Sequence, residues 1–236
     1  MVLIGVISCG DGSLADPEKI QIDRTQNMNL RSYAFKIEGA YHSPVSFALD
    51  IDKNGISDFQ FTSNIWGSPA IGQHPEADIS CLNNLAFIYV ATISDTAFLF
   101  TKSDTNYQGK VNIILKNTYS CKRISPTDSI RSIINSKHIK VLARFDEIRN
   151  SGPWLSGKLD LNNENYTPPA QNVYNSLDTS VYKVVSYNYD CHSFPDDRIA
   201  YIGIKLIDNG AAKLGWIKLS ITDKYIISIL ETAIQN

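Results

Sequence analysis

The sequence predicts an all-β fold, an antiparallel β-sandwich of jelly-roll type, from three observations. Short runs rich in β-branched and aromatic residues recur at spacings that suit a sandwich or barrel, at 85–92, 96–101, 111–116 and 139–145. Two further runs, 199–207 and 214–221, flank the turn residues Asp-Asn-Gly as in a β-hairpin, and a last strand is expected at 225–230. The 236 residues are enough for one domain with a large core.

The first nine residues, MVLIGVISC, are apolar up to Cys9. The run Val-Ile-Ser-Cys at 6–9 resembles a bacterial lipobox, in which the cysteine is lipidated and becomes the mature N-terminus. This resemblance divides the chain into a signal segment (1–9), a polar tether with an N-terminal arm (10–30) and a single sandwich domain (31–236). The alternative is a buried N-terminal strand with an incidental cysteine, since no Lys or Arg precedes the apolar run.

After an expected strand at 33–38, an acidic stretch separates two alternating segments, 45–51 and 59–62, that are typical of strands. We call residues 50–58 the acidic loop. Oxygen-bearing groups recur there at every second position, with Gly55 sixth in the loop: Asp50, Asp52, Asn54, the backbone carbonyl of Ile56, and Asp58. This spacing predicts a calcium site, because a hard cation takes several carboxylate and carbonyl oxygens.

The acidic loop differs from a helix-loop-helix calcium site in one respect. Phe61 stands where such a site carries a bidentate glutamate. Further oxygens are therefore expected from elsewhere in the chain or from water. The alternative is a plain tight turn, because Asn-Gly is a strong hairpin signal without any metal.

Three other segments are expected to interrupt the strands. Residues 64–80 are rich in Gly, Pro, Ser and His and predict a long irregular excursion. The run Ser-Pro-Thr-Asp at 125–128, followed by isoleucines on one helical face, predicts one short helix at 127–136. Residues 162–180 are polar and rich in Asn and Pro, which predicts a surface loop.

The charge balance narrows the classes of binding partner, and the cysteine count limits the possible disulfides. The 22 Lys and Arg against 24 Asp and Glu give no broad field for nucleic acid or an acidic membrane. No apolar stretch approaches the roughly 20 residues that span a bilayer, so the expected membrane contact is only the lipid anchor. Cys81, Cys121 and Cys191 fit one disulfide plus one free thiol, in a pairing that the sequence does not reveal.

The C-terminal strands resemble a known pattern. The runs AYIGI at 200–204, GWIKLSI at 215–221 and ISILETA at 227–233 look like the C-terminal signature of exported bacterial β-sandwich proteins common in Bacteroidetes-type secretomes. Those proteins often carry an aspartate-rich loop near the start, which residues 50–59 match. The resemblance covers 45–61 and 198–234. It implies a sandwich fold and a place at the outer membrane or cell surface, and it implies no activity.

No catalytic residue stands out. The four histidines are scattered, and no nucleophile-elbow motif occurs. Trp66 and Trp154, in Gly- and Pro-rich loops, are candidates for stacking on a ligand, whereas Trp216 lies in a strand pattern and is expected in the core. The sequence therefore predicts a calcium-stabilised, non-catalytic lipoprotein of the cell surface, with either a structural role or a binding role. The partner expected for a binding role is a glycan or another surface protein.

The alternative function is a hydrolase acting on polysaccharide. Such an enzyme needs two carboxylates, which can lie far apart in the sequence. Four acids are eligible and none is singled out: Asp160, Glu164, Asp190 and Asp197.

Overall fold

The computed structural model describes residues 18–68, 72–105, 110–121, 129–162, 170–188 and 194–236. Cys9 and the rest of the expected signal segment lie outside these residues. The described residues form strands and no helix, so none of them provides a helix that could cross a membrane. The predicted all-β class is confirmed.

Seventeen strands follow one another along the described chain. They are β1 (Lys19–Gln21), β2 (Met28–Ile37), β3 (Val45–Leu49), β4 (Phe59–Ser68), β5 (Gly72–Cys81), β6 (Ala86–Thr105), β7 (Val111–Ser120), β8 (Ser129–Ile139), β9 (Val141–Leu142), β10 (Glu147–Arg149), β11 (Trp154–Leu155), β12 (Lys158–Asp160), β13 (Gln171–Asn175), β14 (Thr179–Asn188), β15 (Ile199–Asp208), β16 (Ala211–Thr222) and β17 (Ile226–Gln235).

These strands form three sheets. The largest has the order β13-β14-β7-β6-β15-β16-β17-β2, with β8 and β11 paired to β6 and β9 paired to β15. A four-stranded sheet has the order β12-β5-β4-β3, and β1 pairs with β10. The strands pair antiparallel except β7 and β14, which run parallel. The arrangement is consistent with a sandwich, and the jelly-roll connectivity stays a prediction.

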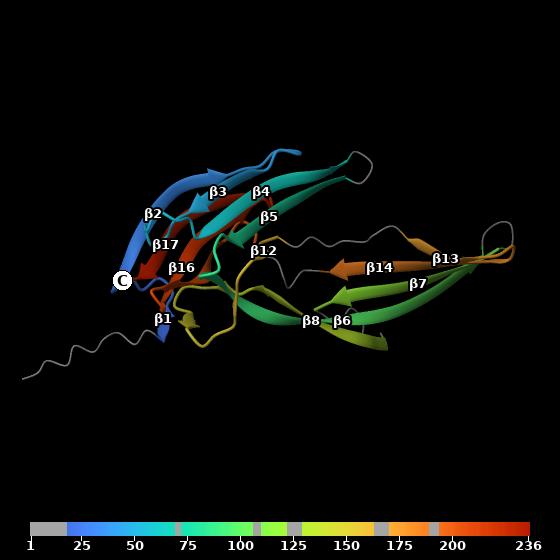
Figure 1. Ribbon diagram of the computed structural model, residues 1–236. Coiled ribbons are helices and arrows are strands. Elements are labelled where there is room, and N and C mark those ends of the chain that lie inside the picture. The colour runs from blue at the N-terminus through green and yellow to red at the C-terminus, as the bar shows by residue number, and fades with distance from the viewer. Residues whose placement is uncertain (1–17, 69–71, 106–109, 122–128, 163–169, 189–193) are drawn as a thin grey trace, which may run out of the picture.

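The main core lies between the four-stranded sheet and the half of the large sheet formed by β15, β16, β17 and β2 (Figure 1). This core fully buries Phe59 and Phe61 of β4 from the four-stranded sheet, and Ile217 and Leu219 of β16 from the large sheet. Successive side chains of a strand point to opposite faces. Trp216 therefore faces away from this core, into a second cluster beneath β1 and β10, and is 0% exposed as the sequence predicts.

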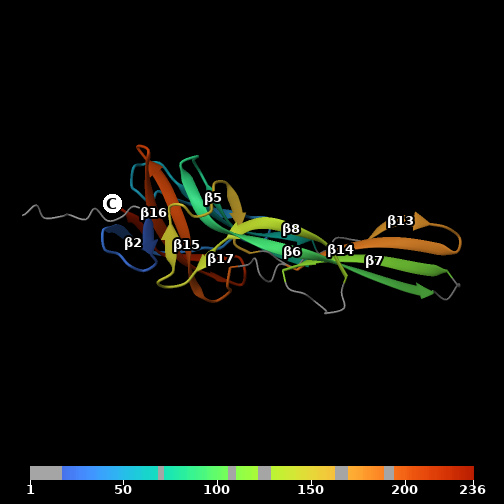
Figure 2. The ribbon, with the colours of Figure 1, turned by 90° about the horizontal axis from the view of Figure 1, so that it is seen from below.

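The remaining part of the large sheet extends away from the sandwich (Figures 1 and 2). We call it the projecting sheet: β7, β13, β14 and residues 96–105 of β6. Strand β6 is 20 residues long, so it pairs with β15 and β11 at one end and with β7 at the other. One continuous strand thus joins the two regions.

The helix predicted at 127–136 is wrong over residues 129–136, which belong to strand β8. This strand pairs with residues 90–99 of β6 in antiparallel register. Isoleucines at 130, 133 and 134 fit one face of a helix, but β-branched side chains also favour strands. The long edge of β6 favours the strand over the helix, because it offers hydrogen-bonding backbone partners to β8.

The irregular excursion predicted at 64–80 is also wrong. Residues 59–68 and 72–81 form the antiparallel hairpin of β4 and β5, with Trp66 opposite His74. Pro75 is tolerated because β12 pairs with β5 only at residues 78–80, so the proline lies where β5 is an edge strand and needs no outward N–H.

Other boundaries differ from the sequence expectation. The runs 85–92 and 96–101 belong to the single strand β6, and 139–145 contains only the end of β8 and the short β9. The surface loop expected at 162–180 includes β13 and the start of β14. Within the expected N-terminal arm, β1 pairs with β10 and Ile22 is fully buried, so this part packs on the sandwich.

Candidate functional site

The acidic loop joins β3 to β4 at one end of the four-stranded sheet. Leu49 lies opposite Phe59 in the strand register, and the Asp58 amide donates a hydrogen bond to the Leu49 carbonyl at 2.7 Å. The side chains of Leu49, Ile51 and Phe59 are buried in the core. The apolar residues on both sides therefore fix the ends of the loop, while Asp50 and Asp52 between them are only partly buried.

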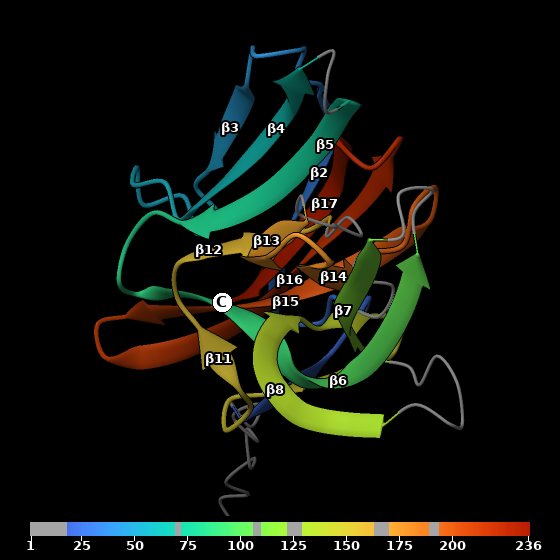
Figure 3. The same cartoon turned by 90° about the vertical axis from the view of Figure 1, so that its right-hand side faces the viewer.

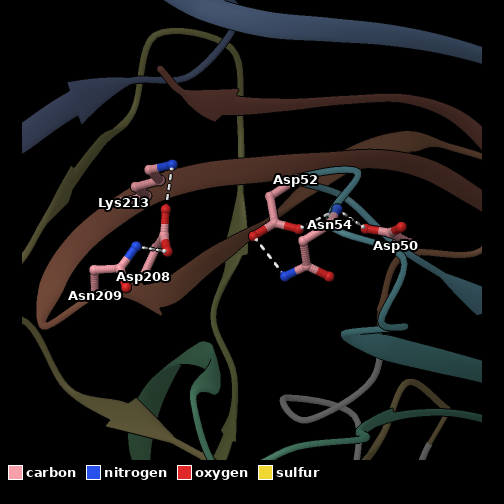
Figure 4. A network of polar contacts seen from close by, with 6 residues as sticks. All are labelled: Asp50, Asp52, Asn54, Asp208, Asn209 and Lys213. Atoms are coloured by element: carbon pink, nitrogen blue, oxygen red, sulfur yellow. Dashed lines mark hydrogen bonds and ion pairs between the residues drawn. The ribbon is translucent and has the colours of Figure 1, made fainter.

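Within the loop, side-chain carboxylates accept hydrogen bonds from the backbone (Figure 4). Asp50 accepts from the amides of Asn54 at 3.2 Å and Gly55 at 2.8 Å. Asp52 accepts from the Asn54 amide and from its side-chain Nδ2, both at 3.1 Å. Gly55 has φ +88°, a conformation that glycine adopts without strain. The predicted glycine position thus allows the chain to fold around the carboxylates.

Asp58 is the buried member of the group, with 3% of its surface exposed. One carboxylate oxygen accepts a hydrogen bond from the Ile51 amide at 2.9 Å, and the other lies 3.4 Å from Nδ2 of Asn83. Burial raises the pKa of Asp58, and the negative charges of Asp52 and Asp50 raise it further. A cation at this place would stabilise the ionised form.

The structure brings three of the predicted ligands together. Carboxylate oxygens of Asp50, Asp52 and Asp58 lie within 4.8 Å of one another. Two oxygens bound to one calcium ion at 2.3 to 2.6 Å can be up to about 5.2 Å apart, so the group fits a single ion of this size. The loop can hold a metal ion, and its geometry alone does not identify which ion.

The two remaining predicted ligands belong to the same loop, and their roles stay predictions. The side-chain oxygen of Asn54 accepts a hydrogen bond from the Ile56 amide at 2.7 Å. The Ile56 side chain is 62% exposed. Sequence reasoning missed Asn83, which comes from the β5–β6 connection and contacts Asp58. No spacing signal could have identified it, because it lies 25 residues further along the chain.

A second acidic turn contains a carboxylate whose negative charge the protein itself neutralises (Figure 4). At the β15–β16 turn, Asp208 pairs with Lys213 at 2.8 Å and accepts a hydrogen bond from Asn209 at 2.9 Å. In the part of the chain that the structure describes, none of the three loop carboxylates forms an ion pair with Lys or Arg. The acidic loop therefore concentrates negative charge that the described protein does not balance.

The two tryptophans proposed for ligand stacking have different surroundings. Trp66 is 42% exposed on the β4–β5 hairpin, and its ring stacks on His74 at 4.5 Å. Trp154 is half-buried: its indole N–H donates to the Asn150 carbonyl at 2.9 Å, and its ring lies 4.9 Å from the Tyr89 ring. Trp66 is the better candidate for contact with a ligand, because less of its ring is occupied by the protein.

The two described cysteines differ in state, one in a disulfide and one a free thiol, as the sequence allowed. Cys121 is disulfide-bonded, and Cys81 is a free thiol. Burial raises the pKa of Cys81, so this thiol is less reactive than an exposed one. Cys9 and Cys191 lie outside the described residues.

Of the four acids eligible for hydrolysis, two lie outside the described residues, Glu164 and Asp190. Asp197 lies before β15, where its amide donates to the Ile221 carbonyl. Asp160 lines a pocket of about 280 Å³ together with Asp95. Sequence reasoning missed this pocket, since its walls come from five different strands.

No protein-family model, no curated protein and no solved structure matches this chain.

Proposed function

We propose that this protein is a calcium-stabilised, non-catalytic binding module of the bacterial cell surface. The observation that carries the proposal is the gathering of Asp50, Asp52 and Asp58 in a loop whose ends are fixed by the core. Three carboxylates this close repel one another, and a calcium ion would replace that repulsion with oxygen coordination. The ion would hold β3 and β4 together and would take no part in a reaction.

Two observations support export and anchoring. Cys121 is disulfide-bonded, and disulfides persist mainly in oxidising compartments outside the cytosol. The lipobox-like run at 6–9 supplies a cysteine for lipidation. We place the protein at the outer membrane or cell surface, attached through Cys9.

The anchor can be tested by metabolic labelling with a fatty-acid probe in bacteria that express the full-length gene. Cys9→Ala should abolish the label and release the protein from the detergent fraction. Cys81→Ala is the matched control, because Cys81 is a half-buried thiol within the sandwich and should leave labelling unchanged. Full labelling of Cys9→Ala would remove the anchor from the proposal.

A glycan is the ligand class proposed for this module, with another surface protein as the competing partner. The support is the exposed ring of Trp66, because aromatic rings provide apolar faces on which sugar rings stack. Trp66→Ala should weaken binding on a glycan array, whereas Tyr174→Ala, an exposed aromatic on β13, should not. A turnover assay on the bound glycans decides the remaining alternative, since release of shortened products would establish a hydrolase.

A further inference from the structure

The place where the projecting sheet leaves the sandwich holds the pocket of about 280 Å³. One wall is formed by Tyr119 of β7 and Tyr187 of β14, which lie opposite each other in the parallel register. Their rings stack at 5.2 Å with an angle of 12° between the ring planes. The pocket therefore has one wall made of a stacked aromatic pair, held in place by the pairing of two strands.

The second wall comes from the neighbouring strands of the same sheet, β6 and β8, which curve beside β7 (Figure 3). Asp95 of β6 lies opposite Ile134 of β8 in the register, and Ser136 and His138 follow at alternate positions of β8. Alternate residues of a strand share one face. The polar groups of β8 thus point to the same side as Asp95 and the two tyrosines.

Asp160 closes the pocket from the other sheet, since it belongs to β12. It is exposed, whereas Asp95 is buried, so Asp160 is the carboxylate of the pocket that solvent reaches more easily. The neighbouring cation, Lys158, pairs with Asp78 at 3.0 Å and with Glu76 at 3.2 Å. Asp160 is therefore available at the entrance as a hydrogen-bond acceptor.

The lining combines groups of both hydrogen-bonding types. Carboxylates only accept, while the hydroxyls of Ser136, Tyr119 and Tyr187 both donate and accept, and a neutral imidazole does each at one nitrogen. Ser136 and His138 already lie 2.7 Å apart, which orients the two groups. A ligand rich in hydroxyl groups satisfies such a mixture, because each hydroxyl also both donates and accepts.

We propose that this pocket is a binding subsite for one sugar ring. The aromatic wall would contact the apolar face of the ring, and the carboxylates, Ser136 and His138 would bind its hydroxyls. The volume lies just below the roughly 300 to 1,000 Å³ of pockets that enclose drug-sized ligands, which suits a single ring and excludes an enclosed oligosaccharide. The subsite rests on the proposed glycan-binding function and adds a second contact, separate from Trp66.

The test uses the whole protein and a panel of free monosaccharides: glucose, galactose, mannose and N-acetylglucosamine. Ligand-observed NMR titration should show saturable binding of at least one sugar to the wild type. Asp160→Ala and Ser136→Ala should each weaken this binding about tenfold or more, the loss of one or two good hydrogen bonds. Asp160→Ala is the decisive variant, because the residue is exposed and its substitution should leave the fold intact, which the Tm of the variant checks.

Asp178→Ala is the matched control. It removes the same side chain from the far end of the projecting sheet, beside Thr179, which is eight residues or about 26 Å along β14 from Tyr187. Its binding should equal that of the wild type. Unchanged binding in Asp160→Ala and Ser136→Ala, or no saturable binding of any sugar in the panel, would overturn the subsite.

The outcomes separate the two proposals. If glycans bind on the array and lose affinity in Trp66→Ala but not in Asp160→Ala, the pocket proposal fails and the glycan-binding function stands. If the wild type binds no glycan on the array, the proposed glycan-binding function fails together with the subsite.

Discussion

The two ends of the large sheet are stabilised in different ways. In the sandwich, β16 is covered on both faces, with Ile217 and Leu219 against the four-stranded sheet and Trp216 in the second cluster. In the projecting sheet, β7 is half-buried along almost its whole length and β13 is exposed throughout. The sandwich therefore has a core on each side, and the projecting sheet has strand pairing with little apolar burial.

This difference has an energetic consequence. Full burial of a large apolar side chain contributes about 1.5 to 3 kcal/mol, whereas a cross-strand side-chain pair contributes about 0.2 to 1 kcal/mol. The projecting sheet depends on the second kind of contact, such as the stacked pair Tyr119 and Tyr187. The sandwich therefore sets the stability of the fold, and the projecting sheet contributes surface and one wall of the pocket.

The largest expected effect comes from the same substitution in the two regions. Leu219→Ala, at a fully buried position of β16, should lower the free energy of unfolding by about 2 to 5 kcal/mol. Leu115→Ala, at a half-buried position of β7, should lower it by about 1 kcal/mol or less. Urea unfolding of both variants measures the difference. Equal losses would mean that the projecting sheet is covered by a core of its own.

The next effect concerns the disulfide at the base of the projecting sheet. Cys121 directly follows β7, so its crosslink restrains the strand where it leaves the sandwich. Removing a disulfide from a domain costs about 2 to 4 kcal/mol. In hydrogen exchange, Cys121→Ser should speed exchange of the β7 and β14 amides by about tenfold or more, and should leave β16 and β17 less affected.

The control for this experiment is Cys81→Ser, which removes the free thiol and leaves the disulfide in place. It should not selectively expose β7 and β14. Uniform acceleration over all strands in Cys121→Ser would show that the two regions unfold as one unit.

Part of the sandwich was predictable, because several of its strands follow the rules of buried strands, whereas β5 lies in a segment that was expected to be irregular. The hairpin of β15 and β16, for example, combines apolar runs with an Asp-Asn-Gly turn. Strand β13 was missed, because a strand exposed along its whole length carries no apolar alternation. The helix predicted at 127–136 failed for a related reason. The spacing of the isoleucines can be read from the local sequence, whereas the pairing of β8 with the edge of β6 depends on a distant segment.

The two candidate sites differ in the same way, since one was predictable from the sequence and the other was not. The acidic loop was predictable because its three carboxylates lie within nine consecutive residues, with a glycine at the position that needs positive φ. The pocket was not predictable, because Asp95 and Asp160 are 65 residues apart and meet only through the packing of two sheets. Sequence spacing identifies a site built by one loop, and it does not identify a site built by tertiary structure.

The calcium proposal is tested most directly by thermal unfolding in millimolar calcium and in chelator. Extracellular calcium modules bind at about 10⁻⁴ to 10⁻³ M, and calcium at ten times its dissociation constant adds about 1.4 kcal/mol by mass action. At about 2 to 4 °C per kcal/mol, the wild-type Tm should rise by about 3 to 6 °C, and magnesium should raise it less because it requires a tighter octahedral shell.

Asp52→Ala should lose this rise, because it removes one of the three carboxylates of the acidic loop. Asp208→Ala is the control, since it removes an acid that Lys213 already neutralises, and its Tm should still rise with calcium. A wild-type Tm that is indifferent to calcium, or an Asp52→Ala variant that responds as fully as the wild type, would reduce residues 50–58 to a plain turn.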